Sequence, residues 1–187
     1  MWFSTGVAVV CAAIPIVAPA TIIGGPITNP ANGHDYYLLA PANWTDSEAE
    51  AVTLGGHLAT INDAAENAWV FSTFENFGGS ARNLFIGLND AAQEGTFVWV
   101  SGAPVVYTNW KAGEPNDSSG TEDYGMIANR FEPGSPDGKW IDMFHAGGFF
   151  GPYPVNGVAE VVPEPTTAAL LGLGLTGLAA AGRRRRA

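Results

Sequence analysis

The sequence predicts an α+β domain, because two segments with helical character come first and a series of short strands follows. Residues 49–54 and 68–74 place apolar side chains at helical spacing, and each segment precedes a pair of glycines that favours a helix end. The later part of the chain contains short runs typical of antiparallel strands, divided by Gly, Pro, Asn and Asp. The length of 187 residues allows one domain with its own core after both ends are set aside.

The expected elements follow in chain order. Residues 35–40 are predicted to form the first strand, and a capping box from Thr45 to Glu48 begins the first helix. The second helix begins at Asn62 or Asp63, where Glu66 is placed to complete a box with Asp63. Five further strands are expected in the sequences LFIGL, TFVWV, YGMIA, KWIDM and GVAEVV.

Both ends of the chain have the character of processing signals. Residues 7–20 are almost wholly apolar and finish in an A-x-A pattern, which predicts a signal peptide over residues 1–20; a buried N-terminal strand is the alternative. Residues 166–182 are apolar and just long enough to span a bilayer, and four arginines follow them at 183–186. These arginines would hold the C-terminus on the cytoplasmic side, so that the body of the protein lies outside.

The C-terminal segment has three parts, which are Pro163-Glu164-Pro165, the apolar run and the arginine cluster. In this order they resemble the PEP-CTERM sorting signal of bacteria that make extracellular polysaccharide. The resemblance implies removal of the tail by exosortase, a membrane protease, and so a transient membrane contact before release to the cell surface or matrix. A plain C-terminal anchor is the alternative, and it would leave the outward-facing domain in place.

The charge of the central region makes nucleic acid an unexpected partner. Residues 21–162 contain four basic and seventeen acidic residues, a net charge of −13. Such a surface repels a phosphate backbone. The only cysteine, Cys11, lies in the predicted signal peptide, so the exported domain is expected to fold without a disulfide.

An acidic stretch in the long connection 101–123 carries the strongest functional signal. The sequence GEPNDSSGTEDYG, residues 113–125, has four carboxylates and one amide but no Lys, Arg or His. Carboxylates confined to one loop must stay far apart, take up protons or share a cation. Oxygen ligands suit Ca²⁺, whereas zinc or copper would favour His or Cys. The loop is therefore predicted to bind calcium.

Several motifs in order along the chain resemble C-type lectin domains. The sequence LGGHLATINDAAENAWV (54–70) resembles the family's helix-one to helix-two signature, and FIGLNDAAQEGTFVWVSG (85–102) resembles its core strand and the segment after it. YTNWKAGEPN (107–116) resembles the approach to the calcium loop, in the EPN form associated with mannose-type sugars. The resemblance covers Tyr36 to about Val161. It implies a C-type lectin-like fold, with two helices, short antiparallel sheets and a long calcium-binding loop.

Carried over position by position, the resemblance implies two calcium sites. The main site, which also holds the sugar in this family, maps onto Glu114, Asn116, Glu122 and Asp142. The auxiliary site maps onto Asp90, Glu94, Asp117 and Asp123. At one main-site position Ile141 replaces the asparagine of the family's WND motif, which provides a calcium oxygen and an amide donor to the sugar.

The four cysteines that usually form two disulfides in this fold are also replaced. By motif position they correspond to Ala51 with Ala159 and to Tyr124 with His145, and a packed aromatic pair is expected in place of the second bridge. Calcium binding is expected to offset part of the stability lost with the disulfides. The expected organisation is a signal peptide at 1–20, a linker at 21–35, a C-type lectin-like domain at 36–162 and the sorting signal at 163–187.

The sequence thus favours an exported calcium-dependent carbohydrate-binding module at the bacterial cell surface or in an exopolysaccharide matrix. The implied mechanism is direct ligation, in which two sugar hydroxyls replace water on the calcium ion. A calcium-stabilised adhesion or matrix protein that binds protein is the alternative, and Ile141 favours it. An enzyme is not expected, because the chain has no G-x-S-x-G motif, phosphate loop or zinc signature, and carboxylates around a calcium ion are poor at exchanging protons. A glycoside hydrolase ranks third.

Overall fold

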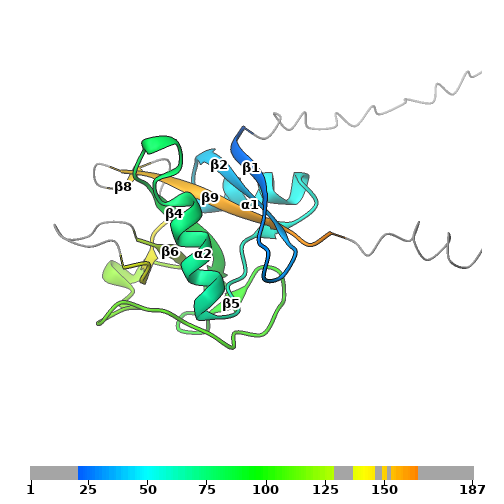
Figure 1. Ribbon diagram of the computed structural model, residues 1–187. Helices are drawn as coiled ribbons and strands as arrows, with labels where there is room; N and C mark the ends of the chain where they lie inside the picture. The colour runs from blue at the N-terminus through cyan, green and yellow to red at the C-terminus, as the bar shows by residue number, and fades with distance from the viewer. Residues whose placement is uncertain (1–20, 129–136, 146–148, 151–152, 164–187) are drawn as a thin grey trace, which may run out of the picture.

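The computed structural model describes residues 21–128, 137–145, 149–150 and 153–163. A mixed sheet forms the centre of the molecule, and two helices pack on it (Figure 1). The strand order is β1 (Ile22–Thr28), β2 (Asp35–Pro41), β9 (Tyr153–Val161), β4 (Asn83–Asn89), β6 (Tyr124–Ile127) and β7 (Trp140–Met143). Three short strands join this path, as β3 (His57–Leu58) and β8 (Phe149–Phe150) pair with β9 and β5 (Val98–Trp99) pairs with β4.

The predicted α+β class is confirmed, but the sheet is not purely antiparallel. β4 runs parallel to β9, with Asn83 opposite Val155 and Phe85 opposite Gly157. The two strands are far apart in the chain, so a crossover and not a hairpin joins them, which permits the parallel arrangement. The other pairs along the main path are antiparallel, as expected.

The segment 21–35, expected as a linker, instead contributes β1 to the edge of the sheet. Its register with β2 runs from Ile22 opposite Leu39 to Thr28 opposite Asp35, with two irregularities between these ends. The strand has the sequence IIGGPIT, in which glycine and proline are residues that strands disfavour. For this reason the sequence pattern does not predict it.

The first helix, α1 (Trp44–Thr53), has its N-cap two residues earlier than predicted. Its N-cap is Asn43, whose side chain accepts a hydrogen bond from the Asp46 backbone N–H at 2.7 Å. Glu48 does not close a capping box, because its carboxylate accepts the Leu58 backbone N–H at 2.8 Å and lies 2.7 Å from His57 Nδ1. The predicted cap at Thr45 is therefore wrong, since Glu48 connects the helix to β3.

The second helix, α2 (Ala64–Phe74), begins as predicted at an Asp63 N-cap, which accepts the Glu66 backbone N–H at 2.8 Å. The Glu66 side chain accepts a hydrogen bond from the backbone N–H of Asn62, the residue before the cap, at 2.7 Å. The expected reciprocal bond to Asp63 is thus shifted by one residue. Glu66 also accepts a bond from the Tyr36 hydroxyl at 2.6 Å, so the start of α2 is connected to β2.

The core has two parts, one on each face of the sheet, because side chains alternate between the faces of a strand. On β4, Leu84 and Ile86 belong to the cluster that includes Val70 and Phe74 of α2, whereas Phe85 belongs to the cluster that includes Ala51 of α1. Figure 1 shows α2 crossing in front of the sheet. The same alternation places Trp140 and Ile141 of β7 in different clusters.

The positions of the missing disulfides are filled as the sequence predicts. Ala51 and Ala159 are both fully buried in one cluster. Tyr124 and His145 pack with their ring centroids 5.6 Å apart, and Tyr124 also packs on Trp44 at 4.8 Å. An aromatic stack therefore connects α1, β6 and the segment after β7, where the family usually has a covalent bridge.

Candidate functional site

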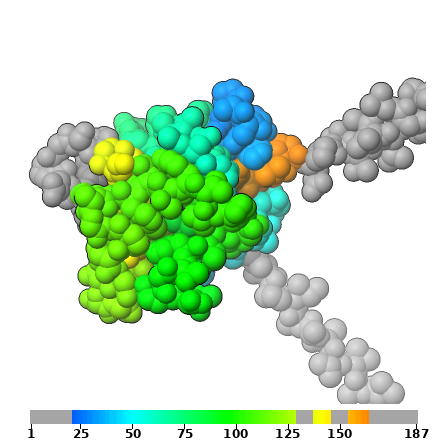
Figure 2. Space-filling model, turned by 90° about the horizontal axis from the view of Figure 1, so that it is seen from below, coloured from blue at the N-terminus to red at the C-terminus, as the bar shows by residue number. Residues whose placement is uncertain are grey.

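The acidic loop lies in the long connection between β5 and β6. Between Trp99 and Tyr124 the chain forms turns, a short 3-10 helix at Ser118–Gly120 and an isolated bridge from Trp110 to Trp140. Figure 2 shows the green to yellow-green part of the chain, which includes this connection, over much of one face of the molecule. The orange end of β9 lies across that face from the yellow-green region. The predicted long loop is thus a defined surface on the domain.

Asp142 fixes the loop to the sheet. It lies on β7 opposite Gly125 of β6, and only 2% of it is exposed. Its two carboxylate oxygens each accept the Asn116 backbone N–H at 3.0 Å, and Oδ2 also accepts the Asp117 backbone N–H at 2.7 Å. A strand residue therefore brings its charge under the EPN segment and sets the position of that segment.

Two of the other predicted main-site residues, Glu114 and Asn116, contact this carboxylate, and Glu122 lies near enough for its charge to act on Glu114. The Asn116 side-chain amide donates to Glu114 Oε2 at 2.6 Å, and the Glu114 carboxyl is hydrogen-bonded to Asp142. Glu122 accepts the Ser118 backbone N–H at 2.9 Å, and its own backbone N–H donates to Asp117 Oδ1 at 3.2 Å. The structure thus brings Glu114 and Asn116 to Asp142, whereas Glu122 lies nearby and is held by contacts within the loop.

The electrostatics of this group favour a cation. The pKa of Glu114 is raised to about 7, first by burial, then by the hydrogen bond to Asp142 and by the charges of Asp142 and Glu122. Burial also raises the pKa of Glu122, and the charges of Asp142 and Asp117 act in the same direction, against the Ser118 N–H. Carboxyl groups that repel each other in this way release their protons more readily when a positive ion lies among them.

The auxiliary set assembles beside the main site. Carboxylate oxygens of Asp90, Glu94 and Asp123 lie within 4.8 Å of one another. Asp117 belongs to the same environment, because its charge raises the pKa of Glu94 after the effects of burial and Asp90. Asp90 is held by the Gly95 backbone N–H, which donates to Oδ2 at 2.9 Å, and by its own N–H, which donates to the Asp123 carbonyl at 3.0 Å.

An unpaired oxygen in this set indicates that its residues fit a metal ion. Asp90 is 1% exposed, yet its Oδ1 has no hydrogen-bond partner among the described residues. Burial, followed by the nearby charges of Asp123 and Asp142, raises the pKa of Asp90 against the opposing Gly95 N–H. A buried carboxylate oxygen without a donor is costly unless a cation or water satisfies it, and oxygen ligands suit calcium.

Ile141 does not contribute to the main site. It is 4% exposed and packs in the core cluster that contains Met126 and Met143. Its aliphatic side chain has neither an oxygen for a metal ion nor a donor for a sugar hydroxyl. The EPN segment and Asp142 are therefore in place without the asparagine of the family's WND motif.

Sequence comparison identifies the family at this point. The family model described as the Lectin C-type domain matches residues 40–144. The chain belongs to the C-type lectin domain family. A second model, the PEP-CTERM protein-sorting motif, matches residues 161–186, so this is an exported lectin-like protein.

Similar proteins cover the same region. A perlucin-like protein of Mytilus galloprovincialis is 32% identical over 117 residues, which are 59% of this chain and 74% of that protein. A C-type lectin mannose-binding isoform of Oxyuranus scutellatus is 35% identical over 96 residues, which are 50% of this chain and 61% of that protein. The solved structure of the C-type lectin CEL-I from Cucumaria echinata has a TM-score of 0.59 at 25% identity and covers 81% of this chain and 100% of that one.

The sorting motif begins at residue 161, where β9 ends. None of the helices in the described part of the chain combines the length and the apolar character needed to cross a bilayer. The helix expected at 166–182 lies outside the described residues. The sorting motif itself therefore supports export, and the membrane-spanning helix stays a prediction.

The raised pKa of Glu114 predicts how the calcium-free lectin domain responds to pH. Because the folded-state pKa of about 7 exceeds the ordinary 4.5, the folded state binds more protons between these values. The free energy of unfolding should therefore fall as pH rises through this window. Urea unfolding in chelator at about pH 5 and about pH 8 would measure this fall, which should be smaller in Glu114→Gln. Equal falls in both proteins would contradict the assignment to Glu114.

Proposed function

We propose that the lectin domain is a calcium-dependent carbohydrate-binding module with a mannose-type loop. The observation that carries this proposal is the attachment of Glu114 and Asn116 to the buried Asp142, with Glu122 nearby, where burial and then the neighbouring negative charges raise the pKa of Glu114 to about 7. These residues would hold a calcium ion at the main site. Asp90, Glu94, Asp117 and Asp123 would hold a second ion at the auxiliary site.

A bound calcium ion would supply open coordination positions for two neighbouring sugar hydroxyls. The chain's own residues orient the sugar: Glu114 and Glu122 accept hydrogen bonds from these hydroxyls, and the Asn116 amide donates one. Asp142 keeps the loop in the required position through the Asn116 and Asp117 backbone N–H groups. Each such bond to an ionised group is stronger than a bond between neutral groups, which supports recognition of a neutral sugar at an exposed loop.

The proposed ligand is a polymeric glycan at the bacterial cell surface or in an exopolysaccharide matrix. Few contacts at an exposed loop predict weak binding of a single sugar, and many copies of a sugar on one surface would compensate by multivalency. The EPN sequence and the mannose-binding relative support a mannose-type preference. The sorting motif supports processing by an exosortase-type protease, with transient membrane contact through residues 166–182.

The binding role also accounts for the carboxylates without an enzymatic reaction. The carboxylates of the site already accept hydrogen bonds from backbone N–H groups of the loop. Calcium ligation would engage their remaining oxygen lone pairs. We therefore propose a non-enzymatic binding protein. The proposed organisation is a signal peptide at 1–20, a lectin domain that extends from β1 through residue 162, and the sorting signal at 163–187.

A second candidate function rests on Ile141. Because this side chain is buried and apolar, the main site has one metal ligand and one sugar contact fewer than the family pattern. A protein that uses calcium to hold its fold and that binds another protein, as an adhesin or matrix component, would tolerate this change. It predicts stabilisation by calcium without retention on any sugar.

Affinity chromatography distinguishes the two candidates. The protein is applied with calcium to immobilised mannose and to the exopolysaccharide of its host, and a chelator is then added to the wash. Retention that is lost with the chelator, and lost in Glu122→Gln but kept in the exposed control Asp137→Asn, is the expected result. Passage through both columns by a protein that calcium still stabilises would refute the lectin function and support the second candidate.

A further inference from the structure

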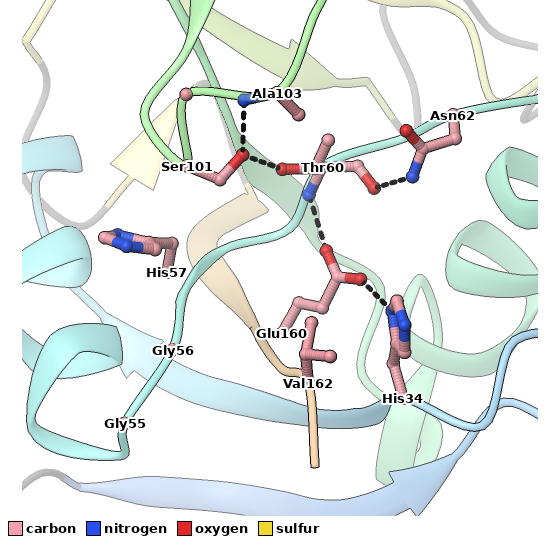
Figure 3. Close-up of a pocket in the computed structure, with 11 residues that line it drawn as sticks. His34, Gly55, Gly56, His57, Thr60, Asn62, Ser101, Ala103, Glu160 and Val162 are labelled. Atoms are coloured by element: carbon pink, nitrogen blue, oxygen red, sulfur yellow. Dashed lines mark hydrogen bonds and ion pairs between the residues drawn. The ribbon is translucent and has the colours of Figure 1, made fainter. Parts of the chain in front are cut away.

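A cavity away from the acidic loop has a second concentration of polar groups. It has a volume of about 560 Å³, which lies in the range of small-molecule sites. Its lining combines the first turn after α1 with the end of β9 and the segment that follows β5 (Figure 3). Gly56 allows the close approach of two of these segments, since a Cβ atom there would lie 2.0 Å from the Glu160 carbonyl oxygen.

The negative charge of this cavity comes from Glu160, which is 8% exposed. Its Oε1 lies 2.5 Å from His34 Nδ1, and its Oε2 accepts the Thr60 backbone N–H at 2.9 Å. A second carboxylate, that of Glu66, lies close to Glu160. One carboxylate oxygen of each residue and a ring nitrogen of His34 lie within 4.8 Å of one another. The lining of the cavity includes no lysine or arginine in the described part of the chain, so His34 and His57 are its only basic groups.

Glu160, which lines the cavity, has one acceptor position that no described residue fills. Tyr36 has a single hydroxyl proton, and its oxygen is nearer to Glu66 Oε1, at 2.6 Å, than to Glu160 Oε1, at 3.1 Å. Each carboxylate oxygen can accept about two hydrogen bonds, and among the described residues Oε2 accepts only the Thr60 N–H. Burial and then the charge of Glu160 raise the pKa of Tyr36, so the Tyr36 hydroxyl stays protonated and serves as a donor here.

The other polar groups of the cavity are hydroxyls and an amide. Thr60 Oγ1 and Ser101 Oγ lie 2.7 Å apart, and Asn62 is beside them (Figure 3). An ammonium group has three donors and no acceptor, so it matches an open carboxylate position surrounded by hydroxyl oxygens. The hydroxyl oxygens of Thr60 and Ser101 can accept hydrogen bonds from further donors of a ligand, which suits a hydroxylated ring beside the ammonium group.

We propose that this cavity is a second carbohydrate subsite, which binds the ammonium group of an amino sugar at Glu160. The proposal rests on the glycan-binding function, because it gives the same polymer a second point of contact. It requires no calcium. A sugar with a free amine would bind, and its N-acetylated form would bind less well because the charge is lost.

The histidine ring signals in NMR spectra of the full protein test this subsite independently of the loop. With chelator present, so that the calcium sites do not act, glucosamine is expected to shift the His34 signals at a concentration about tenfold lower than N-acetylglucosamine or glucose, as one charge-assisted bond implies. Glu160→Gln should remove the difference among these sugars, and the control Asp137→Asn should keep it. Because the comparison among sugars uses the unaltered protein, it stands even if Glu160→Gln fails to fold.

Three outcomes would overturn the assignment. Equal effects of glucosamine and glucose would show that the ammonium group is not recognised. A stronger effect of Nα-acetyl-lysine amide than of glucosamine would indicate a protein partner in place of an amino sugar. In a separate titration without chelator, a shift of the His34 signals by calcium at lower concentration than by glucosamine would indicate a metal site. Loss of retention at the loop would leave the His34 result unchanged, so the two proposals fail separately.

Discussion

Asp142→Asn is expected to abolish calcium-dependent glycan retention. The substitution keeps the shape of the side chain but removes the charge that a metal ion would require. It also replaces one acceptor oxygen by an NH₂ group, so the Asn116 and Asp117 backbone N–H groups lose part of their shared acceptor. Hydrogen bonds to a charged group contribute about 1.5–3 kcal/mol each, so the EPN segment should also be held less firmly.

The measurements for this variant are calcium binding by calorimetry, retention on immobilised glycan and unfolding by urea. The wild type should bind calcium and be retained, whereas Asp142→Asn should bind fewer calcium ions, should not be retained and should unfold at lower urea concentration in the absence of calcium. Asp137→Asn is the matched control, because Asp137 is an exposed carboxylate outside both predicted sites. Calcium-dependent retention by Asp142→Asn equal to that of the wild type would exclude Asp142 from the site.

Trp140→Ala is expected to produce the largest loss of stability, about 3–5 kcal/mol. Trp140 is fully buried, and its ring packs edge to face on Trp99, Tyr107 and Trp110 at centroid distances of 5.9, 5.6 and 5.8 Å. Its indole N–H donates to Asn67 Oδ1 at 2.7 Å, so truncation also leaves a buried amide of α2 without that donor.

The same substitution should weaken calcium binding without touching a predicted ligand. Trp140 lies two residues before Asp142 on β7, and its backbone carbonyl accepts the Lys111 N–H at 2.8 Å near the start of the EPN segment. Urea unfolding and a calcium titration would measure both effects. Val106→Ala is the control, because Val106 is 71% exposed in the same long connection. A loss no greater than that of Val106→Ala would contradict the role of Trp140 in joining the core to the loop.

The sequence predicts the fold where local pattern and tertiary structure agree. The strand LFIGL and the helix that begins at Asp63 are found where apolar periodicity and capping chemistry place them. The sequence does not predict β1, because its glycines and proline suit only an edge strand. Its place at the edge follows from the pairing of β2 with β9, which the local sequence does not show. The sequence does not predict the cap at Asn43, because the Glu48 carboxylate binds the Leu58 backbone N–H of β3 and does not close a box with Thr45.

The candidate calcium site shows the same division. Its acidic residues are close in sequence apart from Asp90, Glu94 and Asp142, and the EPN motif identifies the group without a structure. The cavity at Glu160 gives no such signal, because His34 and Glu160 are 126 residues apart and meet only through the pairing of β2 with β9. Sequence patterns reveal sites that one loop supplies, whereas sites assembled by a sheet require its register.

The melting temperature of the wild-type protein in calcium and in chelator at neutral pH tests the central claim most directly. An ion that binds only the folded state stabilises it by about 2.7 kcal/mol at a concentration of one hundred times its dissociation constant. For a domain of this size we expect a rise of about 5–10 °C in calcium, reversed by the chelator and smaller in Asp142→Asn. An identical melting temperature in calcium and in chelator would contradict calcium binding by the acidic loop.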